Sequence, residues 1–530
     1  MNERLVEDWL TKASERAYQT AFAQSLLLER MEVLRLGHSA HEHGKDIIAV
    51  DQTGSVHAYQ LKDEDLDLKG LEKALPQITA LVETQVEHPG LSGCPKHHPW
   101  LVTSGNLTIP VEDRIRVHNI TWKKRGFRPL QTITGKQLIA RFVKMAGNFW
   151  PQMPEDSRRL FNLYLANGKG SLDRDNFSQM LNTATLGPST AAKAQTFRQL
   201  AAGNLFTSYA LSSFYRAGNH WEVIQGWIIS AARTAEIAER RGLQCNAWLP
   251  TFNLALNEAL TSAYSLASEA LKPDALRPQG NEWDEQTRAR CTMCAGIIAA
   301  TILIKRKGGE VWDRETEGRR TLMDVLRQGR VFIWGESAIP FVLAIVWALD
   351  VLTPEQLSDG LLLSTIGVIA RTNTTSGSLK LPHVYDSADE AMAKVLRGLL
   401  DGEGGLRQQA PVSLALEPLV HLAALRLWRN QLAGMWSPLS KVRLLRLVPD
   451  EPVDTLLWRW ERTCGQNQTR NFNAPQSWPE LLAEARRDEL RSIPNILRER
   501  FEFALLFLLC FPHRISTGLI KHLDGLVSRL

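Results

Sequence analysis

Cysteine is scarce in this chain, with six residues in 530. A framework of disulfides needs a denser set, and the N-terminus has no charged-then-apolar signal segment, so we expect a protein of the reducing cytoplasm. Cys291 and Cys294 have the spacing of a metal-binding pair, but no second pair accompanies them. The apolar run that follows them favours a buried helix instead.

Long apolar runs are also missing. The longest uncharged one, residues 337–349, is interrupted by Pro340 and is shorter than the ~20 residues that a membrane span needs. We therefore expect no transmembrane segment and no membrane partner. The sequence also lacks a phosphate-binding loop, so it gives no sign of a motor domain in this chain. It lacks a nucleophile-elbow motif as well.

The sequence also has no large excess of charge of one sign. The formal net charge is only +5 and the pI is near 8.8, which permits nucleic-acid binding without requiring it. The composition, 44% hydrophobic and 22% charged, is that of a soluble globular protein.

The length indicates more than one domain. A mixed pattern of strands and helices covers residues 1–145, and a segment with Gly147 and Pro151, residues 146–157, has the composition of a linker. Beyond it, residues 158–530 read as a succession of helices with almost no strand-like alternation and no repeat. The sequence therefore predicts an α/β N-terminal domain followed by a large, mostly α-helical C-terminal domain.

Within the α/β part, one stretch combines a hairpin with reactive side chains. An apolar run, Ile47–Val50, is followed by a polar turn containing glycine and then by a second strand over residues 55–62. Side chains alternate along a strand, so Gln60 and Lys62 point to the same face. Asp46 begins the first strand, and pairing across the turn is expected to bring its carboxylate beside them.

This set of side chains suits metal-assisted hydrolysis of a phosphodiester. Mg²⁺ or Mn²⁺ prefers oxygen ligands, which Asp46 supplies as a carboxylate and Gln60 as an amide oxygen. Lys62 would orient or deprotonate the attacking water and offset charge on the phosphate.

These residues resemble a known family. Gly44 and Asp46, an apolar strand, and then Gln60 and Lys62 match the Mrr-like branch of the PD-(D/E)xK restriction-endonuclease-like nucleases, which has Gln-x-Lys in place of the usual acid-x-Lys. The resemblance covers about the first 145 residues. It implies a restriction-endonuclease-like fold, catalysis by Asp46, Gln60 and Lys62, and a metal-dependent endonuclease that cuts DNA.

In such nucleases, a helix before the catalytic strands contributes a further acid. The spacing of apolar residues predicts a helix over residues 2–36, on which Glu15 is placed to be this catalytic metal ligand, with Gln19 one turn later. Glu29 and Glu32 are expected to be solvated. Glu42 is an alternative because it closely precedes Asp46.

Between that helix and the hairpin lies a short run with three histidines. His38, His41 and His43 could hold a transition metal, although histidines in a polar loop are more often solvated.

Elements after the hairpin also follow the order of the family. Acidic residues 63–67 are expected to cap a helix that runs through Val82. A buried strand over residues 99–108 ends in a Thr-x-Gly similar to the family's, and a helix should begin near Val111. A further short strand is expected near residues 120–122.

Two basic groups are candidates for nucleic-acid contact. Lys123, Lys124 and Arg125 close the α/β domain, although a solvated turn explains them equally well. In the helical domain, a stretch without acids combines cations with Trp428 and Trp436, a mixture that suits phosphates and unpaired bases, while its leucines also indicate a core. Its candidate contacts are Arg426, Arg429, Lys441 and Arg443.

Biologically, the resemblance implies bacterial restriction or anti-phage defence, with a helical domain that senses or binds a partner such as a separately encoded ATPase or sensor protein. Two alternatives stay open. The same fold could act on RNA or branched DNA, or the chain could be a non-catalytic helical scaffold or interaction protein whose nuclease domain has decayed. A homo-oligomer is compatible with either.

Overall fold

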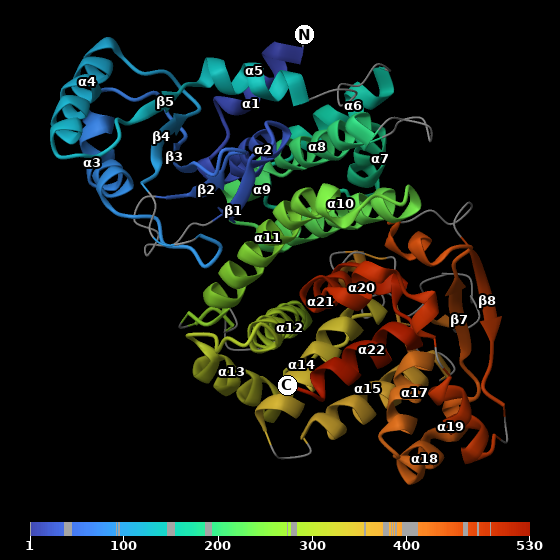
Figure 1. Cartoon of the computed structure of the whole chain (residues 1–530). Coiled ribbons are helices and arrows are strands. Elements are labelled where there is room, and N and C mark those ends of the chain that lie inside the picture. The colour runs from blue at the N-terminus through green and yellow to red at the C-terminus, as the bar shows by residue number, and fades with distance from the viewer. Residues whose placement is uncertain are drawn as a thin grey trace. The chain divides into compact units, whose positions relative to one another are not determined.

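A computed structural model (Figure 1) divides the chain into two compact units, Met1–Leu260 and Thr261–Leu530, which are described separately. The described residues are 2–36, 45–91, 93, 96–145, 154–185, 193–272, 274–276, 284–353, 357–374, 381–382, 384, 386, 390–394, 412–458, 465–473, 476–487 and 489–530.

The predicted hairpin is present. Strands β2 (Ile47–Val50) and β3 (Val56–Lys62) pair antiparallel around a tight turn. Gly54 adopts φ +80°, the left-handed conformation that glycine accepts without strain, and the Asp51 carboxylate accepts a hydrogen bond from Thr53 N at 2.8 Å. The turn residues therefore set the register of the strands that carry the candidate site.

The hairpin forms part of a five-stranded mixed sheet in the order β1-β2-β3-β4-β5. The added strands are β1 (Glu32–Leu36), β4 (His98–Thr103) and β5 (Gln131–Ile133). Strands β1, β2 and β3 pair antiparallel, whereas β3, β4 and β5 pair parallel. Each parallel connection contains a helix, as parallel strands require: α3 (Leu68–Glu83) and α4 (Ile109–Lys124).

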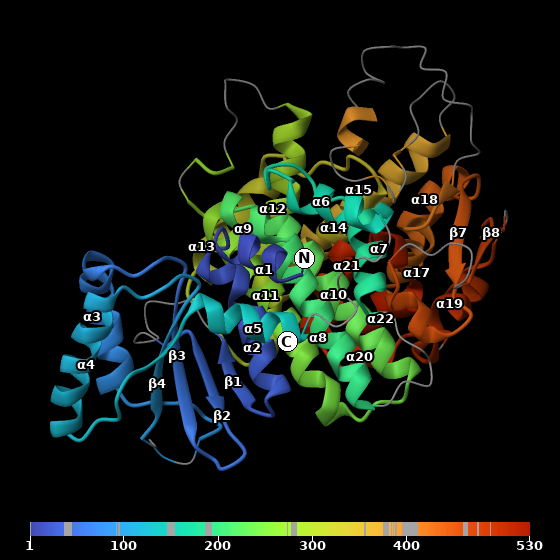
Figure 2. The same ribbon diagram turned by 90° about the horizontal axis from the view of Figure 1, so that it is seen from above.

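Helices cover both faces of this sheet, with α3 and α4 on one side and α2 (Glu15–Leu28) on the other (Figure 2). Val56 and Ala58 of β3 are buried in a cluster with Leu71 and Ile78 of α3. Each such aliphatic side chain larger than alanine stabilises the fold by roughly 1.5–3 kcal/mol when it leaves water, as an upper estimate. This core fixes the strand whose last residues form the candidate site.

The N-terminal helix predicted over residues 2–36 is wrong in extent. The segment folds as α1 (Asn2–Leu10), α2 and then β1, with α2 beginning after Ser14 and a positive φ of 63° at Arg30 before the strand. Short apolar stretches fit the periodicity of a helix and of a strand equally well. Pairing with β2 makes residues 32–36 a strand.

The strand predicted near residues 120–122 is also wrong, because these residues lie inside α4. Isoleucine, threonine and tryptophan favour strands, but burial of one face of a helix outweighs that local preference here. Val111, Ile115 and Trp122 are all buried on one side of α4. The short strand that follows is β5. The capped helix is confirmed, with Asp67 accepting a hydrogen bond from Gly70 N at 2.7 Å.

In the described residues, seven further helices follow, and the last of them extends beyond Leu260, where the first unit ends. They are α5 (Gly135–Met145), α6 (Pro154–Tyr164), α7 (Arg174–Thr185), α8 (Lys193–Ala210), α9 (Ser212–Ala217), α10 (His220–Arg240) and the long α11 (Cys245–Ala270). Helix α8 packs against α2. The expected linker, residues 146–157, therefore falls inside a unit that ends at Leu260, and residues 146–153 of it lie outside the described part.

The second unit is mostly helical, as expected. Its helices are α12 (Glu285–Lys307), α13 (Glu315–Arg327), α14 (Ile339–Leu352), α15 (Leu357–Thr374), α17 (Leu416–Leu425), α18 (Arg429–Leu439), α19 (Trp478–Arg486), α20 (Asn495–Glu499), α21 (Phe501–Cys510) and α22 (Thr517–Val527).

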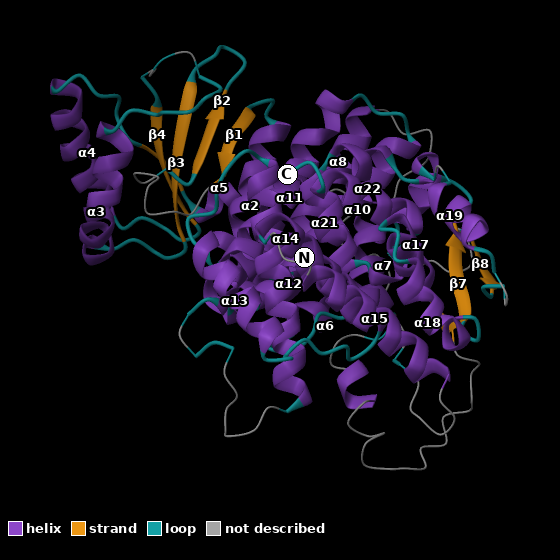
Figure 3. Cartoon of the chain, turned by 90° about the horizontal axis from the view of Figure 1, so that it is seen from below, coloured by secondary structure: helices purple, strands orange, loops and turns teal. Residues whose placement is uncertain are grey.

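A small sheet in this unit was not predicted. Strands β6 (Val412–Ser413), β7 (Arg443–Val448) and β8 (Gln466–Arg470) form it, in that order. Strands β7 and β8 lie side by side in Figure 3. Every residue of β8 is exposed and polar, so this strand carries no alternation of apolar and polar side chains from which to predict it.

Helix α12 is, in the described part of the chain, the one helix long and apolar enough to cross a membrane, and 72% of its apolar window is buried inside the structure. It packs against α14, as the core helix of a soluble protein does. Cys291 and Cys294 both lie on α12 as free thiols, which confirms the predicted helix. Burial raises the pKa of Cys294 to about 12, which disfavours the thiolate form that metals bind.

Candidate functional site

Asp46 and Gln60 meet across the hairpin. Asp46 N donates to Tyr59 O at 2.8 Å, which places its side chain opposite Gln60. Asp46 Oδ2 accepts hydrogen bonds from Leu61 N at 2.6 Å and from Gln60 Nε2 at 2.7 Å. Both side chains are buried, so these bonds hold the carboxylate in one orientation at the end of β3.

Lys62 and Glu15 form an ion pair beside them. Lys62 Nζ lies 3.0 Å from Glu15 Oε1, and the side chains are 14% and 26% exposed. Burial raises the pKa of the Glu15 carboxyl above its ordinary value, and the Lys62 ammonium opposes that shift. Glu15, the acid that the sequence placed on the helix before the strands, therefore contacts Lys62, the lysine of Gln-x-Lys.

One face of α2 supplies the rest of the site. Glu15, Tyr18 and Gln19 lie three and four residues apart, the spacing of neighbours on one side of a helix. Gln19 Nε2 donates to Asp46 O at 3.1 Å, and Tyr18 Oη donates to Lys62 O at 2.7 Å. The helix thus anchors the backbone of both hairpin strands where their functional side chains begin.

Tyr18 was missed by the sequence reasoning. Its ring is fully buried, and burial raises the pKa of its hydroxyl well above the ordinary value, so it remains a hydrogen-bond donor to Lys62 O. Its position three residues after Glu15 was the available signal, because it faces the same side of the helix.

The Thr-x-Gly at the end of β4 has a visible structural role. Thr103 Oγ1 donates to Glu64 O, and Asn106 N donates to Asp65 Oδ1 at 2.6 Å. A Cβ added to Gly105 would lie 2.5 Å from Asp65 N, so only glycine allows the two segments to approach this closely. This loop holds the chain directly after Lys62.

A divalent metal at this site would require several oxygen ligands. In the described residues, no group of three or more His, Cys, Asp or Glu side chains lies close enough to hold a metal. Gln60 Oε1, however, is buried without a hydrogen-bond partner, next to the Asp46 carboxylate. A buried amide oxygen lacks a donor there, and a hard cation or a water would satisfy it, so the donor set fits Mg²⁺ with bound waters.

The basic group predicted to contact nucleic acid in the first unit lies far from this site. Helix α4 starts near the end of β4 and runs back, so Lys123, Lys124 and Arg125 lie at the opposite end of the strands, about 20 Å from Lys62 by strand length. Arg125 also binds Glu83 of α3 with both guanidinium nitrogens. The structure does not bring these cations to the candidate site.

The four basic candidates of the second unit differ among themselves. Arg426 is mostly buried and forms ion pairs with three carboxylates, those of Asp350, Asp359 and Asp524. The other three, Arg429, Lys441 and Arg443, are exposed.

The two tryptophans of that stretch are engaged in packing or hydrogen bonding within the second unit. Trp428 is only 8% exposed, and Trp436 packs at 5.3 Å from Phe472 while its Nε1 donates to Asn473 O at 3.1 Å. Their rings therefore contribute to packing, as the neighbouring leucines indicated.

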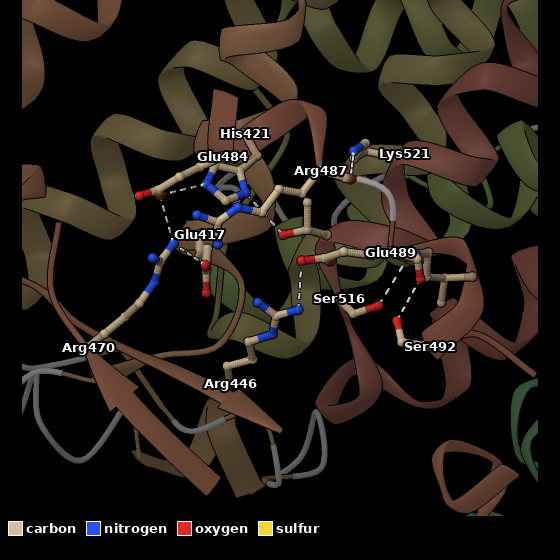
Figure 4. A network of polar contacts seen from close by, with 12 residues as sticks. Glu417, His421, Arg446, Arg470, Glu484, Arg487, Glu489, Ser492, Ser516 and Lys521 are labelled. Carbon is tan, nitrogen blue, oxygen red and sulfur yellow. Dashed lines mark hydrogen bonds and ion pairs between the residues drawn. The ribbon is translucent and has the colours of Figure 1, made fainter. Parts of the chain in front are cut away.

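Two cations of the small sheet, Arg446 and Arg470, form ion pairs (Figure 4). Arg446 Nη2 lies 2.7 Å from Glu489 Oε1, and Arg470 binds Glu417 and Glu484. Arg470 thus joins β8 to α17 and α19, and Arg446 joins β7 to the segment that follows α19, so these cations stabilise the packing of the small sheet.

Several positions named from the sequence fall outside the described residues. These are Gly44, Glu42 and the three histidines at 38, 41 and 43. The chain matches no protein-family model, no curated protein and no solved structure.

Proposed function

We propose that the N-terminal α/β part is a Mg²⁺- or Mn²⁺-dependent endonuclease that cuts DNA, and that the second unit senses or binds a partner. The observation that carries this proposal is the meeting of Asp46, Gln60, Lys62 and Glu15 at one end of β3. The order of elements supports it as well, since a helix, a three-stranded antiparallel part, a helix and a parallel strand follow one another as in the restriction-endonuclease-like nucleases.

The residues have distinct roles in this proposal. Asp46 and Gln60 Oε1 would hold the metal, which supplies an activated water and neutralises phosphate charge. Lys62, kept in place by Glu15 and by Tyr18 on its carbonyl, stabilises the negative charge that develops on the phosphate. Glu15 holds Lys62 and is the further candidate ligand.

The biological setting follows from the family resemblance. A cytoplasmic effector of bacterial restriction or anti-phage defence would be switched on by a signal that reaches the second unit, from a separately encoded ATPase or sensor protein. Exposed Arg429, Lys441 and Arg443 are candidates for contacts with DNA or with that partner.

One observation favours the second candidate, an interaction protein with a decayed nuclease domain. Glu15 is bound to Lys62, and in the described residues no three acidic or metal-binding side chains converge. A working nuclease of this class would need water molecules or substrate phosphate to complete the metal ligands.

Cleavage of supercoiled plasmid by the wild type and Lys62→Ala, with Mg²⁺, Mn²⁺ or EDTA, separates the two. Lys69→Ala is the matched control, because Lys69 is an exposed lysine on the following helix. We expect nicking that requires metal. It should be lost in Lys62→Ala and persist in Lys69→Ala. Parallel reactions with RNA and branched DNA identify the substrate class. No metal-dependent cleavage of any of these, with candidate partner proteins added, would reject the nuclease.

A further inference from the structure

Three arginines gather at the C-terminal end of α10, inside the first unit. Arg233 and Arg240 lie on this helix, and Arg241 directly follows it. Both of the first two bind the buried carboxylate of Glu236: Arg233 Nη1 donates to Oε2, and Arg240 Nε donates to Oε1 at 2.6 Å. The other acid of this segment, Glu239, lies about 120° around the helix from Arg233. Three guanidinium groups and one buried carboxylate leave an excess of positive charge here.

The arginines also contact buried side chains of the neighbouring helices, since α7 and α8 both pack against α10 (Figure 1). Arg233 Nε donates to Oγ1 of Thr185, the last residue of α7, at 3.2 Å. Arg241 Nη1 donates to two residues of α8, to Thr196 Oγ1 at 2.8 Å and to Gln199 Oε1 at 3.2 Å. These hydrogen bonds fix the guanidinium groups where the three helices meet.

The partners of Arg233 and Arg241 lie close together. A Cβ added to Gly203 of α8 would be 2.9 Å from Thr185 Cγ2, so the end of α7 lies against α8 at Gly203. Gln199 precedes Gly203 by four residues, on the same face of α8. The two sets of hydrogen bonds are therefore about one helical turn, ~5.4 Å, apart along α8.

The side-chain amide of Gln199 points to a missing hydrogen-bond acceptor. Gln199 is 5% exposed, and its Nε2 has no hydrogen-bond partner in the described part of the chain. Burial of an amide donor without an acceptor is unfavourable, so such groups are usually paired. Reversing the amide would turn Nε2 towards the donors of Arg241, which favours the orientation as it stands. An acceptor that satisfied Nε2 would also meet the charge of Arg241.

The arginines weaken one another's charged forms. Burial lowers the pKa of the Arg233 guanidinium, and the charges of Arg240 and Arg241 lower it further, whereas the Glu236 carboxylate opposes the shift. An anion bound among these groups would offset their repulsion.

We propose that this basic cluster, formed by Arg233, Arg240, Arg241 and Gln199, binds the dianionic phosphate group of a phosphate monoester. A phosphate presents three terminal oxygens in different directions, which suits donors that come from two helices, whereas a carboxylate presents two oxygens in one plane. The Arg240 side chain is 40% exposed, so the cluster is open to solvent. A 5′-phosphate end of a nucleic acid and a small phosphorylated molecule both present this dianion. The proposal does not depend on the nuclease activity proposed above.

Titration calorimetry with inorganic phosphate tests the site directly. EDTA in the buffer keeps metal away from Asp46, and chloride keeps the ionic strength equal. Wild type should bind phosphate, and Arg241→Gln should raise the Kd at least ~10-fold because it removes a charge-assisted contact. Arg4→Gln, at an exposed arginine of α1, should bind as wild type does. No binding by wild type, or an equal Kd in Arg241→Gln, overturns the proposal.

Gln199→Glu gives a second readout. Its carboxylate would stand in for the ligand beside Arg241, so this variant should melt at a higher temperature than wild type without phosphate. Phosphate should then raise the melting temperature of wild type and of Gln179→Glu, at an exposed glutamine of α7, but not that of Gln199→Glu. A rise with phosphate that persists in Gln199→Glu would overturn the proposal.

Gln199→Leu covers the case in which Arg241→Gln does not fold. It removes the unpaired donor without adding a charge and should raise the Kd for phosphate at least ~3-fold. An equal Kd in Gln199→Leu and wild type would show that the amide takes no part in binding and would overturn the assignment.

The source of the phosphate is decided with two single-stranded oligonucleotides in EDTA, one with a 5′-phosphate and one with a 5′-hydroxyl. Binding at least ~10-fold tighter with the 5′-phosphate, lost in Arg241→Gln, identifies a nucleic-acid end. Equal binding of the two, with inorganic phosphate still bound, identifies a small phosphorylated molecule. Because no metal is present, none of these results depends on cleavage, and a failure here is distinct from a failure of the nuclease.

Discussion

Lys62 Nζ lies 3.0 Å from Glu15 Oε1, which joins the last residue of β3 to the first turn of α2. The pair spans 47 positions of the chain and brings two separately folded elements into one site. Because the burial that raises the pKa of Glu15 outweighs the attraction of Lys62, this contact has a measurable dependence on pH.

Replacing Glu15 should alter how stability depends on pH. The folded pKa of Glu15 lies above its unfolded value near 4.5, so its contribution is fully present below that value and is lost as pH rises through the raised one. Urea unfolding between about pH 4 and 8 should show that the stability of wild type relative to Glu15→Gln falls with rising pH. Glu72→Gln, an exposed glutamate on α3, should run parallel to wild type. A wild type that gains stability over Glu15→Gln as pH rises would contradict the sign.

A bound divalent metal should raise the melting temperature. A ligand that binds only the folded state stabilises it by about 2.7 kcal/mol at 100 times its Kd. Mg²⁺ or Mn²⁺ should therefore shift wild type upwards and leave Asp46→Ala unshifted at equal ionic strength. Asp113→Ala, at an exposed aspartate of α4, should respond as wild type does. An equal shift in Asp46→Ala would place the metal elsewhere.

Adding a methyl group at Gly105 should destabilise the first unit. The new Cβ would meet Asp65 N at 2.5 Å, and backbone atoms cannot yield as a flexible side chain does. A loss of about 1–3 kcal/mol in the free energy of unfolding is expected for Gly105→Ala, measured by denaturant titration. Gly170→Ala has nothing within 4 Å of its Cβ and should be near neutral. Equal stabilities of the two variants would show that the loop after Lys62 moves aside freely.

Arg426 should matter for stability of the second unit. Removing it leaves Asp350, Asp359 and Asp524 facing one another, each less than a third exposed. Arg426→Leu is expected to lower the free energy of unfolding by about 2 kcal/mol, less than for a fully buried pair because water screens these charges in part. Arg429→Leu, at an exposed site three residues later, should change it by less than about 0.5 kcal/mol. If Arg429→Leu were the more damaging change, this account of the cluster would be wrong.

The sequence by itself determined the local parts of the candidate site. These parts are the turn at Gly54, the alternation of side chains along β3 and the helix cap at Asp67. Each depends on residues that are close in sequence, where backbone sterics and neighbouring hydrogen bonds decide the conformation. The placement of Asp46 opposite Gln60 follows from them, because hairpin register is fixed by the turn.

Tertiary structure decided what lies far apart in sequence. Tyr18 reaches Lys62 O across 44 positions, Gln24 reaches Thr251 across 227, and the first unit ends at Leu260 because helices after the expected linker pack on α2. Such contacts depend on which faces of distant helices can be buried together, and the periodicity of a single segment does not state its partner. The wrong strand near residues 120–122 has the same cause, since burial of one helical face outweighed the local preference of its residues for a strand.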